Sequence, residues 1–209
     1  MSVPSQKSSR DEQRIAKTPS RRRGRERVAA LLDAGADVFA EEGYDAATMT
    51  AIAARAGASI GSLYQFFPTK EHLAAAIHAR HLDALADVLD DLLRDCEGGP
   101  VAVMADRLFA RLTAYLGANP AFIVLGERRT MDPAVKKQAR LRLRRQIEAL
   151  LGAANPPVPR KRHAALAAVI LYMLRMAAML RADDDPAIRD DAVMELKAML
   201  AGHLALSGG

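Results

Sequence analysis

The chain has 209 residues, enough for a small domain joined to a larger one, and half of them are hydrophobic, so a packed core is possible. Its only cysteine, Cys96, excludes an intramolecular disulfide and fits a reducing compartment, so we expect a cytoplasmic protein. The net charge of +5 is uneven: +6 over residues 1–27, −8 over 28–97 and +7 over 98–209. The basic excess therefore belongs to an N-terminal tail and to the second half.

Alanine and leucine dominate the composition, and both are strong helix formers, so the sequence predicts an all-α fold. Residues 1–24 are polar and basic, without an apolar period, and we expect a disordered arm there. The same segment lacks the apolar stretch of a secretory signal.

A helix-turn-helix is predicted within residues 25–73. Apolar side chains recur at three- and four-residue steps from Val28 to Phe39, and Gly43 fits the left-handed position just past a helix end. Two short helices follow, one capped by Thr48 and the other by Ser59, with a glycine turn between them. A long helix is expected over 70–93, and this succession of helices is the helix-turn-helix pattern.

The second short helix, "IGSLYQFF" (60–67), is the segment that would enter a DNA major groove. Small Gly61 and Ser62 permit close approach, whereas Leu63, Phe66 and Phe67 are spaced to point inward. The outward pair consists of a tyrosine, whose hydroxyl suits a phosphate, and a glutamine, whose amide can read adenine. The alternative is a small helical turn with an exposed tyrosine.

Residues 39–73, "FAEEGYDAATMTAIAARAGASIGSLYQFFPTKEHL", resemble the DNA-binding domain of the TetR/AcrR family of bacterial transcriptional regulators. The resemblance implies contacts to the DNA backbone from Thr48, Ser59, Tyr64 and Lys70. It implies that Ile60, Gly61, Ser62 and Gln65 lie at the base edges. The chain departs from the family pattern at Ala51, where an acid is common, at apolar Ile60, and at Gln65, where histidine is frequent. The base preference therefore does not carry over from a relative.

Arginines precede the first helix at Arg21, Arg22, Arg23 and Arg25. Beside a helix-turn-helix they would contact phosphates or enter the adjacent minor groove. They would also offset the acidic charge of residues 28–97. A solvated tail is the alternative.

Residues 74–209 are predicted to form a helical domain with helices near 101–117, 120–129, 132–152, 160–182 and 186–206, separated by prolines. The resemblance implies that this domain binds a small molecule and forms a homodimer through its last two helices. The interface candidates are Leu166, Ile170, Leu174, Leu196, Met199 and Leu200. The pocket candidates are Met104, Leu108, Leu112, Tyr115, Phe122, Leu125, Met173, Arg175 and Met176. Ordinary core packing is the alternative for each apolar member.

The sequence leaves open the role of two charged features of this domain, Arg175 and the basic stretch 128–146. A guanidinium at Arg175, inside the apolar run 164–180, would be buried and need Glu195, an aspartate across the interface, or an anionic ligand. That run is too short for a membrane span, so no membrane association is predicted. The basic stretch 128–146 forms either a solvated face or a means of selecting ligand charge.

No enzyme is predicted, because the sequence shows no convergent polar site. His72, His78 and His81 share one helix without a partner elsewhere, so neither a metal nor a cofactor is expected. The prediction is a homodimeric repressor that binds a palindromic operator in double-stranded DNA and is released by a small, largely apolar effector. The alternative is a regulator without an inducer, controlled by a protein partner or acting architecturally.

Overall fold

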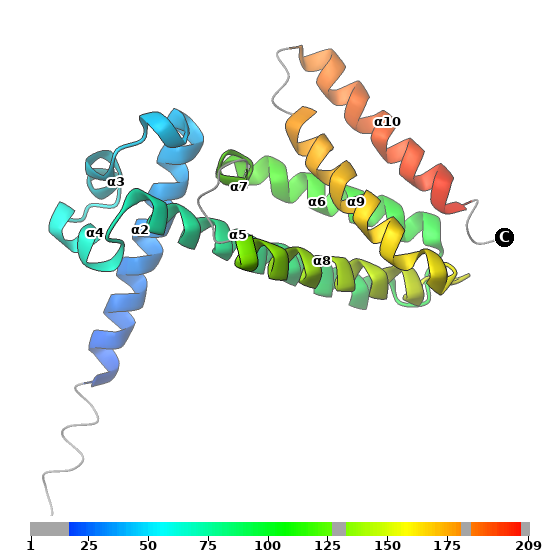
Figure 1. The fold of residues 1–209 in the computed structure, drawn as a ribbon, viewed down its shortest axis with the longest axis horizontal. Coiled ribbons are helices and arrows are strands. Elements are labelled where there is room, and N and C mark those ends of the chain that lie inside the picture. The colour runs from blue at the N-terminus through cyan, green and yellow to red at the C-terminus, as the bar shows by residue number, and fades with distance from the viewer. Residues whose placement is uncertain (1–16, 127–132, 181–184, 206–209) are drawn as a thin grey trace, which may run out of the picture. The chain divides into compact units, whose positions relative to one another are not determined.

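The computed structural model describes residues 17–126, 133–180 and 185–205. It divides into two compact units, Met1–Leu73 and Ala74–Gly209. Throughout the described ranges the regular structure is α-helical, as the composition predicted (Figure 1).

The first unit contains α2 (Lys17–Ala46), α3 (Met49–Arg55), α4 (Ile60–Phe66) and the first turn of α5 (Lys70–Cys96). Residues 17–24, expected to be disordered, instead form the first turns of α2, whereas residues 1–16 lie outside the described ranges. Arginine favours helices, Pro19 is tolerated in a first turn, and Arg22 forms a 3.3 Å ion pair with Glu26 one turn later.

The core of the first unit joins α2, α3, α4 and the start of α5 through side chains that are fully buried: Leu31, Phe39, Ile52, Leu63 and Leu73. At the end of α2, Gly43 has a φ of 76°, the left-handed conformation that was predicted. The chain turns back there, and the Tyr44 ring stacks on Phe39 with 5.5 Å between ring centroids.

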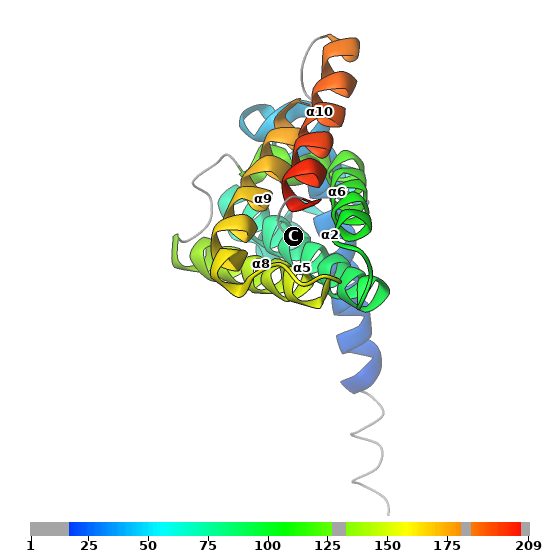
Figure 2. The same ribbon diagram turned by 90° about the vertical axis from the view of Figure 1, so that its right-hand side faces the viewer.

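The second unit contains the rest of α5 and five further helices: α6 (Val101–Ala118), α7 (Pro120–Gly126), α8 (Pro133–Ala153), α9 (Arg160–Leu180) and α10 (Pro186–Ala205). These bounds agree with the predicted ones to within a few residues. Helix α9 packs against α6, α8 and α10, and it lies beside α10 in both ribbon views (Figure 2). Leucines and isoleucines from five helices form the shared core, with Phe109 among them.

The exposed surface of α9 and α10 includes a set of large apolar side chains. Its members are Val169, Tyr172, Met176, Met179, Ile188, Met194 and Met199, which we call the α9/α10 face. Of the six predicted interface residues, only Met199 is strongly exposed. Leu196 is half-buried, and the other four lie in the core of the same chain. For Leu166, Ile170 and Leu174 the reason is that α9 is apolar on most sides, so its sequence does not tell the inner face from the outer one. The interface itself stays a prediction.

By length and composition α9 could cross a membrane, and α6 with α7 would pass the same test if their bend were ignored. Core helices of soluble proteins meet these criteria as well.

Candidate nucleic-acid interface and a pocket in the second unit

Helix α4 is positioned by hydrogen bonds at both sides of the glycine turn. Thr48 Oγ1 accepts from the Ala51 backbone N–H at 3.1 Å, and Ser59 Oγ accepts from the Ser62 N–H at 3.2 Å. Between them Gly57 has a φ of 59°. Both predicted caps are thus present, and they fix where α3 and α4 begin.

The outer face of α4 consists of Ile60, Gly61, Tyr64 and Gln65, all exposed. Tyr64 has 48% of its surface exposed, although nothing in the unit requires a tyrosine there. A Cβ atom added at Gly61 would meet no atom within 4 Å. The fold therefore gives no reason for a glycine inside this helix, where it costs about 1 kcal/mol relative to alanine.

Two residues of α4 lie differently from the prediction. Ser62, expected at the base edges, is buried, and its hydroxyl accepts from Arg27 Nη1 of α2 at 3.4 Å. Phe66, expected inside, is 37% exposed. Helix α4 ends at Phe66, and the backbone of the next residue, Phe67, is extended. The core therefore takes the ring of Phe67 and not that of Phe66.

Lys70 has a different role from the predicted phosphate contact. Its Nζ donates to the backbone oxygens of Tyr44 at 2.8 Å, Asp45 at 3.2 Å and Ala47 at 2.9 Å. It also lies 4.7 Å from the centroid of the Tyr44 ring. An ammonium has three N–H donors, so all of them are used within the unit. The side chain joins α5 to the end of α2 rather than presenting its charge outward.

Three arginines at the start of α2 are exposed, and one of them, Arg22, forms the ion pair with Glu26. Arg22, Arg23 and Arg25 lie on helical turns rather than on a disordered arm. Arg21 lies in the same helix. The predicted DNA contacts of this segment therefore stay a prediction, now for a helix.

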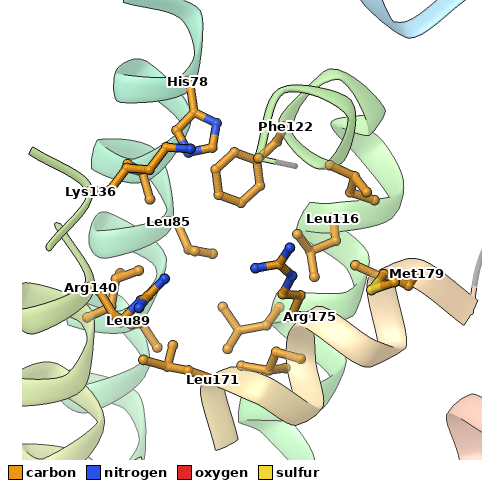
Figure 3. A pocket seen from close by; sticks show the side chains of 17 residues that line it. His78, Leu85, Leu89, Leu116, Phe122, Lys136, Arg140, Leu171, Arg175 and Met179 are labelled. Carbon is orange, nitrogen blue, oxygen red and sulfur yellow. The ribbon is translucent and has the colours of Figure 1, made fainter. Parts of the chain in front are cut away.

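The second unit contains a cavity of about 210 Å³ among α5, α6, α7, α8 and α9 (Figure 3). Eight of the seventeen residues that line it are leucines. The lining residues are His78, Leu82, Leu85, Leu89, Leu112, Leu116, Phe122, Ile123, Gly126, Lys136, Arg140, Leu143, Leu171, Leu174, Arg175, Ala178 and Met179.

Three of the nine predicted pocket residues line this cavity: Leu112, Phe122 and Arg175. The other six do not: Met104, Leu108 and Leu125 are fully buried, Tyr115 and Met173 are half-buried and pack against the core, and Met176 is exposed. Arg175 was expected to be buried, but it is exposed in the structure. His78 was not predicted to line a pocket, and Lys136 and Arg140 were predicted only as part of the basic stretch 128–146, for which ligand charge selection was one alternative. The i,i+4 spacing of the last two on one helix was the available signal.

Two histidines of α5 are buried close to this cavity. His78 packs 4.9 Å from the Phe122 ring, and His81 Nδ1 lies 2.9 Å from the Tyr115 hydroxyl, which donates to the His81 carbonyl at 3.1 Å. Burial, with a smaller effect of Lys136, lowers the pKa of His78 to about 4. Burial also lowers the pKa of His81 and raises that of Tyr115 to about 12.

Acidification is therefore expected to destabilise the second unit. In the unfolded chain His78 takes up a proton below its ordinary pKa of 6.5, whereas in the folded chain it does so only below about pH 4. The free energy of unfolding is therefore unaffected by this group above pH 6.5 and falls as the pH is lowered from 6.5 to about 4. The slope is up to about 1.4 kcal/mol per pH unit for one such group. Melting temperatures at pH 7 and pH 5 should differ less for His78→Gln than for the parent, and equal differences would refute this role for His78.

Residues 31–77 match the family model described as bacterial regulatory proteins, tetR family. The transcriptional activator FasR of Mycolicibacterium smegmatis is 45% identical over 69 residues, 33% of this chain and 32% of FasR. The transcriptional repressor KstR of Mycobacterium tuberculosis is 39% identical over 66 residues, 30% of each chain. The match thus spans about a third of the length of these curated relatives.

Solved structures match most of the chain. A TetR-family regulator from Streptomyces coelicolor has a TM-score of 0.64 at 25% identity, with 87% of this chain and 97% of that one covered. The regulator FadR of Bacillus subtilis, solved in complex with stearoyl-CoA, has a TM-score of 0.65 at 13% identity, with 84% and 96% covered. The second likeness shows the fold alone.

Proposed function

We propose that this chain, which belongs to the TetR family of bacterial transcriptional regulators, is a homodimeric repressor that binds a palindromic operator and releases it when a small molecule occupies the second unit. The outer face of α4 is the observation that carries the proposal. It places a free tyrosine and a free glutamine beside a glycine that the fold does not require. Repression is proposed over activation, although FasR is an activator and KstR a repressor.

In this proposal α4 enters the major groove, where Gly61 allows close backbone approach and Gln65 reads a base edge. Apolar Ile60 suits the methyl group of a thymine. Thr48, Ser59 and Tyr64 contact phosphates through their hydroxyls, and the exposed arginines of α2 supply the charge that the acidic remainder of the unit lacks.

The α9/α10 face supports the dimer. Its seven exposed apolar side chains lie on two neighbouring helices, and a two-fold axis would place this face against its own copy. Two copies would present two α4 helices to successive major grooves, which are about 34 Å apart in a palindromic site.

The cavity supports control by an effector over the inducer-free alternative. Its wall includes α5, whose first turn is fixed to the end of α2 by Lys70. An effector that prefers the state in which the two α4 helices no longer match the groove spacing would shift the dimer off DNA. Its leverage is limited to the difference between its affinities for the two states. The protein acts in the cytoplasm, where DNA is available, and no catalysis is proposed.

Selection of bound fragments from a random pool of double-stranded DNA tests the proposal directly. We expect a palindromic consensus whose half-sites are one helical turn apart. A pool that shows no enrichment would refute operator binding. The selected site then serves for an effector screen, in which compounds are scored by release of the DNA.

Gly61→Ala should separate folding from DNA binding. Alanine is the better helix former by about 1 kcal/mol and has room at this position, so the free protein should melt at a higher temperature. Its affinity for the selected operator should fall at least tenfold, because the added methyl group would lie between the α4 backbone and the bases. Binding is measured by fluorescence anisotropy with labelled operator.

Gly202→Ala is the matched control, since it makes the same change at an open position of α10. It should gain stability and, once sedimentation velocity has shown that it is still a dimer, keep the parent affinity; this check is needed because residue 202 lies one helical turn from Met199. An operator affinity of Gly61→Ala equal to that of this control would show that α4 does not approach DNA closely at residue 61.

A further inference from the structure

The cavity of the second unit joins two kinds of surface. Its apolar wall includes eight leucines, whereas all of its charged side chains are cationic: Lys136 and Arg140 from α8 and Arg175 from α9. No aspartate or glutamate lines it among the residues that the structure describes. Figure 3 shows these three cations and His78 around the same space.

The two arginines of this wall are not neutralised in the way that other cations of the unit are. Arg142, on the same helix, forms an ion pair with Asp83 at 2.8 Å, and Arg111 forms one with Asp95 at 2.5 Å. Within the described ranges Arg140 and Arg175 have no acidic partner. Burial and then the charges of Arg175 and Arg140 lower the pKa of Lys136, so the three cations repel one another.

His78 adds a polar atom without a partner. Only 6% of its residue surface is exposed, and its Nδ1 has no hydrogen-bond partner among the described residues. Because burial keeps this ring neutral, one of its two nitrogens carries a hydrogen and can donate. A polar atom that is buried and unpaired at the wall of a cavity is costly unless a bound molecule satisfies it.

We propose that the effector is an anionic amphiphile, with an apolar chain against the leucine wall and an acidic oxygen group held by Lys136, Arg140 and Arg175, with His78 as an additional donor. The proposal rests on the proposed function and names the chemical class of its effector. The anion relieves the mutual repulsion of the cations, and the cations compensate for its lost hydration. A neutral chain of equal length would gain only the apolar contacts.

Both a free carboxylate and the phosphates of an acyl thioester conjugate present such an anion. The shared chemistry is an apolar chain with acidic oxygens at one end. The experiment therefore includes both sources.

The test compares three probes of one chain length by isothermal titration calorimetry on the full-length protein: decanoate, decan-1-ol and decyltrimethylammonium. We expect decanoate to bind at least tenfold more tightly than the alcohol, and the cation to bind weakest. Equal affinities for decanoate and the alcohol, or tighter binding of the cation, would overturn the proposal. Decanoyl-CoA and decyl phosphate assign the source, because tighter binding than decanoate identifies phosphate as the preferred anion.

Substitutions of single cationic side chains test where the anion binds. Lys136→Met and Arg175→Met should each weaken decanoate at least tenfold and leave decan-1-ol unchanged. Lys137→Met is the matched control: it is the adjacent, exposed lysine, it causes the same loss of charge, and it does not line the cavity. Equal decanoate affinities in Lys136→Met and Lys137→Met would refute the site. Thermal melts verify that each variant is folded, and Arg175→Met should not lower the melting temperature, since it removes a charge that repels Lys136.

Failure of the effector class and failure of the proposed function give different results. If decanoate binds as expected but does not release the selected DNA, the ligand class stands and the regulatory role is wrong. If only neutral compounds bind the cavity and release the DNA, the proposed function stands and the anionic class is wrong.

Discussion

Replacing Lys70 with methionine is expected to destabilise the first unit by about 2–4 kcal/mol and to abolish operator binding with it. The ammonium donates to three backbone oxygens at the end of α2, and hydrogen bonds from a charged donor contribute about 1.5–3 kcal/mol each, less where solvent reaches them. Methionine keeps the length of the side chain and removes every donor. The three oxygens would then depend on water, and the link between the start of α5 and Tyr44 would be weakened, although the Tyr44 hydroxyl still donates to Glu71 Oε1 at 3.1 Å.

Amide hydrogen exchange of the full chain is the suitable measurement, because a two-unit protein need not melt in one transition. Protection should fall in the first unit and stay unchanged in α6 and α8. Arg55→Met is the control, since it breaks the exposed ion pair with Glu41, and solvent screens such pairs so that they contribute little to stability. If Lys70 instead held a DNA phosphate, protection would be unchanged and the salt dependence of binding would lose about one unit of slope.

The example of Lys70 shows what the sequence could and could not predict. The caps at Thr48 and Ser59 and the left-handed Gly43 were predicted correctly, because each depends on residues within a few positions of itself. The partners of Lys70 are more than twenty residues away in the sequence. Position at a helix start indicated a phosphate contact, and nothing local indicated that the end of α2 would supply three acceptors.

The pocket was harder to predict, for a different reason. Hydrophobic periodicity finds the buried face of α6, which correctly includes Met104 and Leu108, but it does not distinguish core from cavity wall. That distinction depends on how neighbouring helices fill the space. The charged wall was visible only as a basic stretch, because a sequence does not say which side of α8 faces α5 and α9.

Val169→Asp should convert the dimer to a monomer and weaken operator binding more than a hundredfold. Val169 is 50% exposed on the α9/α10 face, where the proposed two-fold axis would bury it. A two-fold interface repeats each substitution, so one change brings two carboxylates into the same apolar contact. Burying an unpaired carboxylate costs several kcal/mol, and like charges add repulsion.

Val103→Asp separates this effect from a general response to added charge. It makes the same substitution at a valine of α6 that is 43% exposed and lies outside the α9/α10 face. Sedimentation velocity should give a monomer for Val169→Asp and a dimer for Val103→Asp. A dimer in both variants, with operator affinity unchanged, would show that the two copies associate through another surface.

The loss of DNA binding follows from the number of DNA contacts: two linked α4 helices bind a palindrome far more tightly than one does, because the second half-site is bound at a high effective concentration. A Val169→Asp monomer should therefore still bind a single half-site weakly, with the affinity that the parent shows for the same half-site.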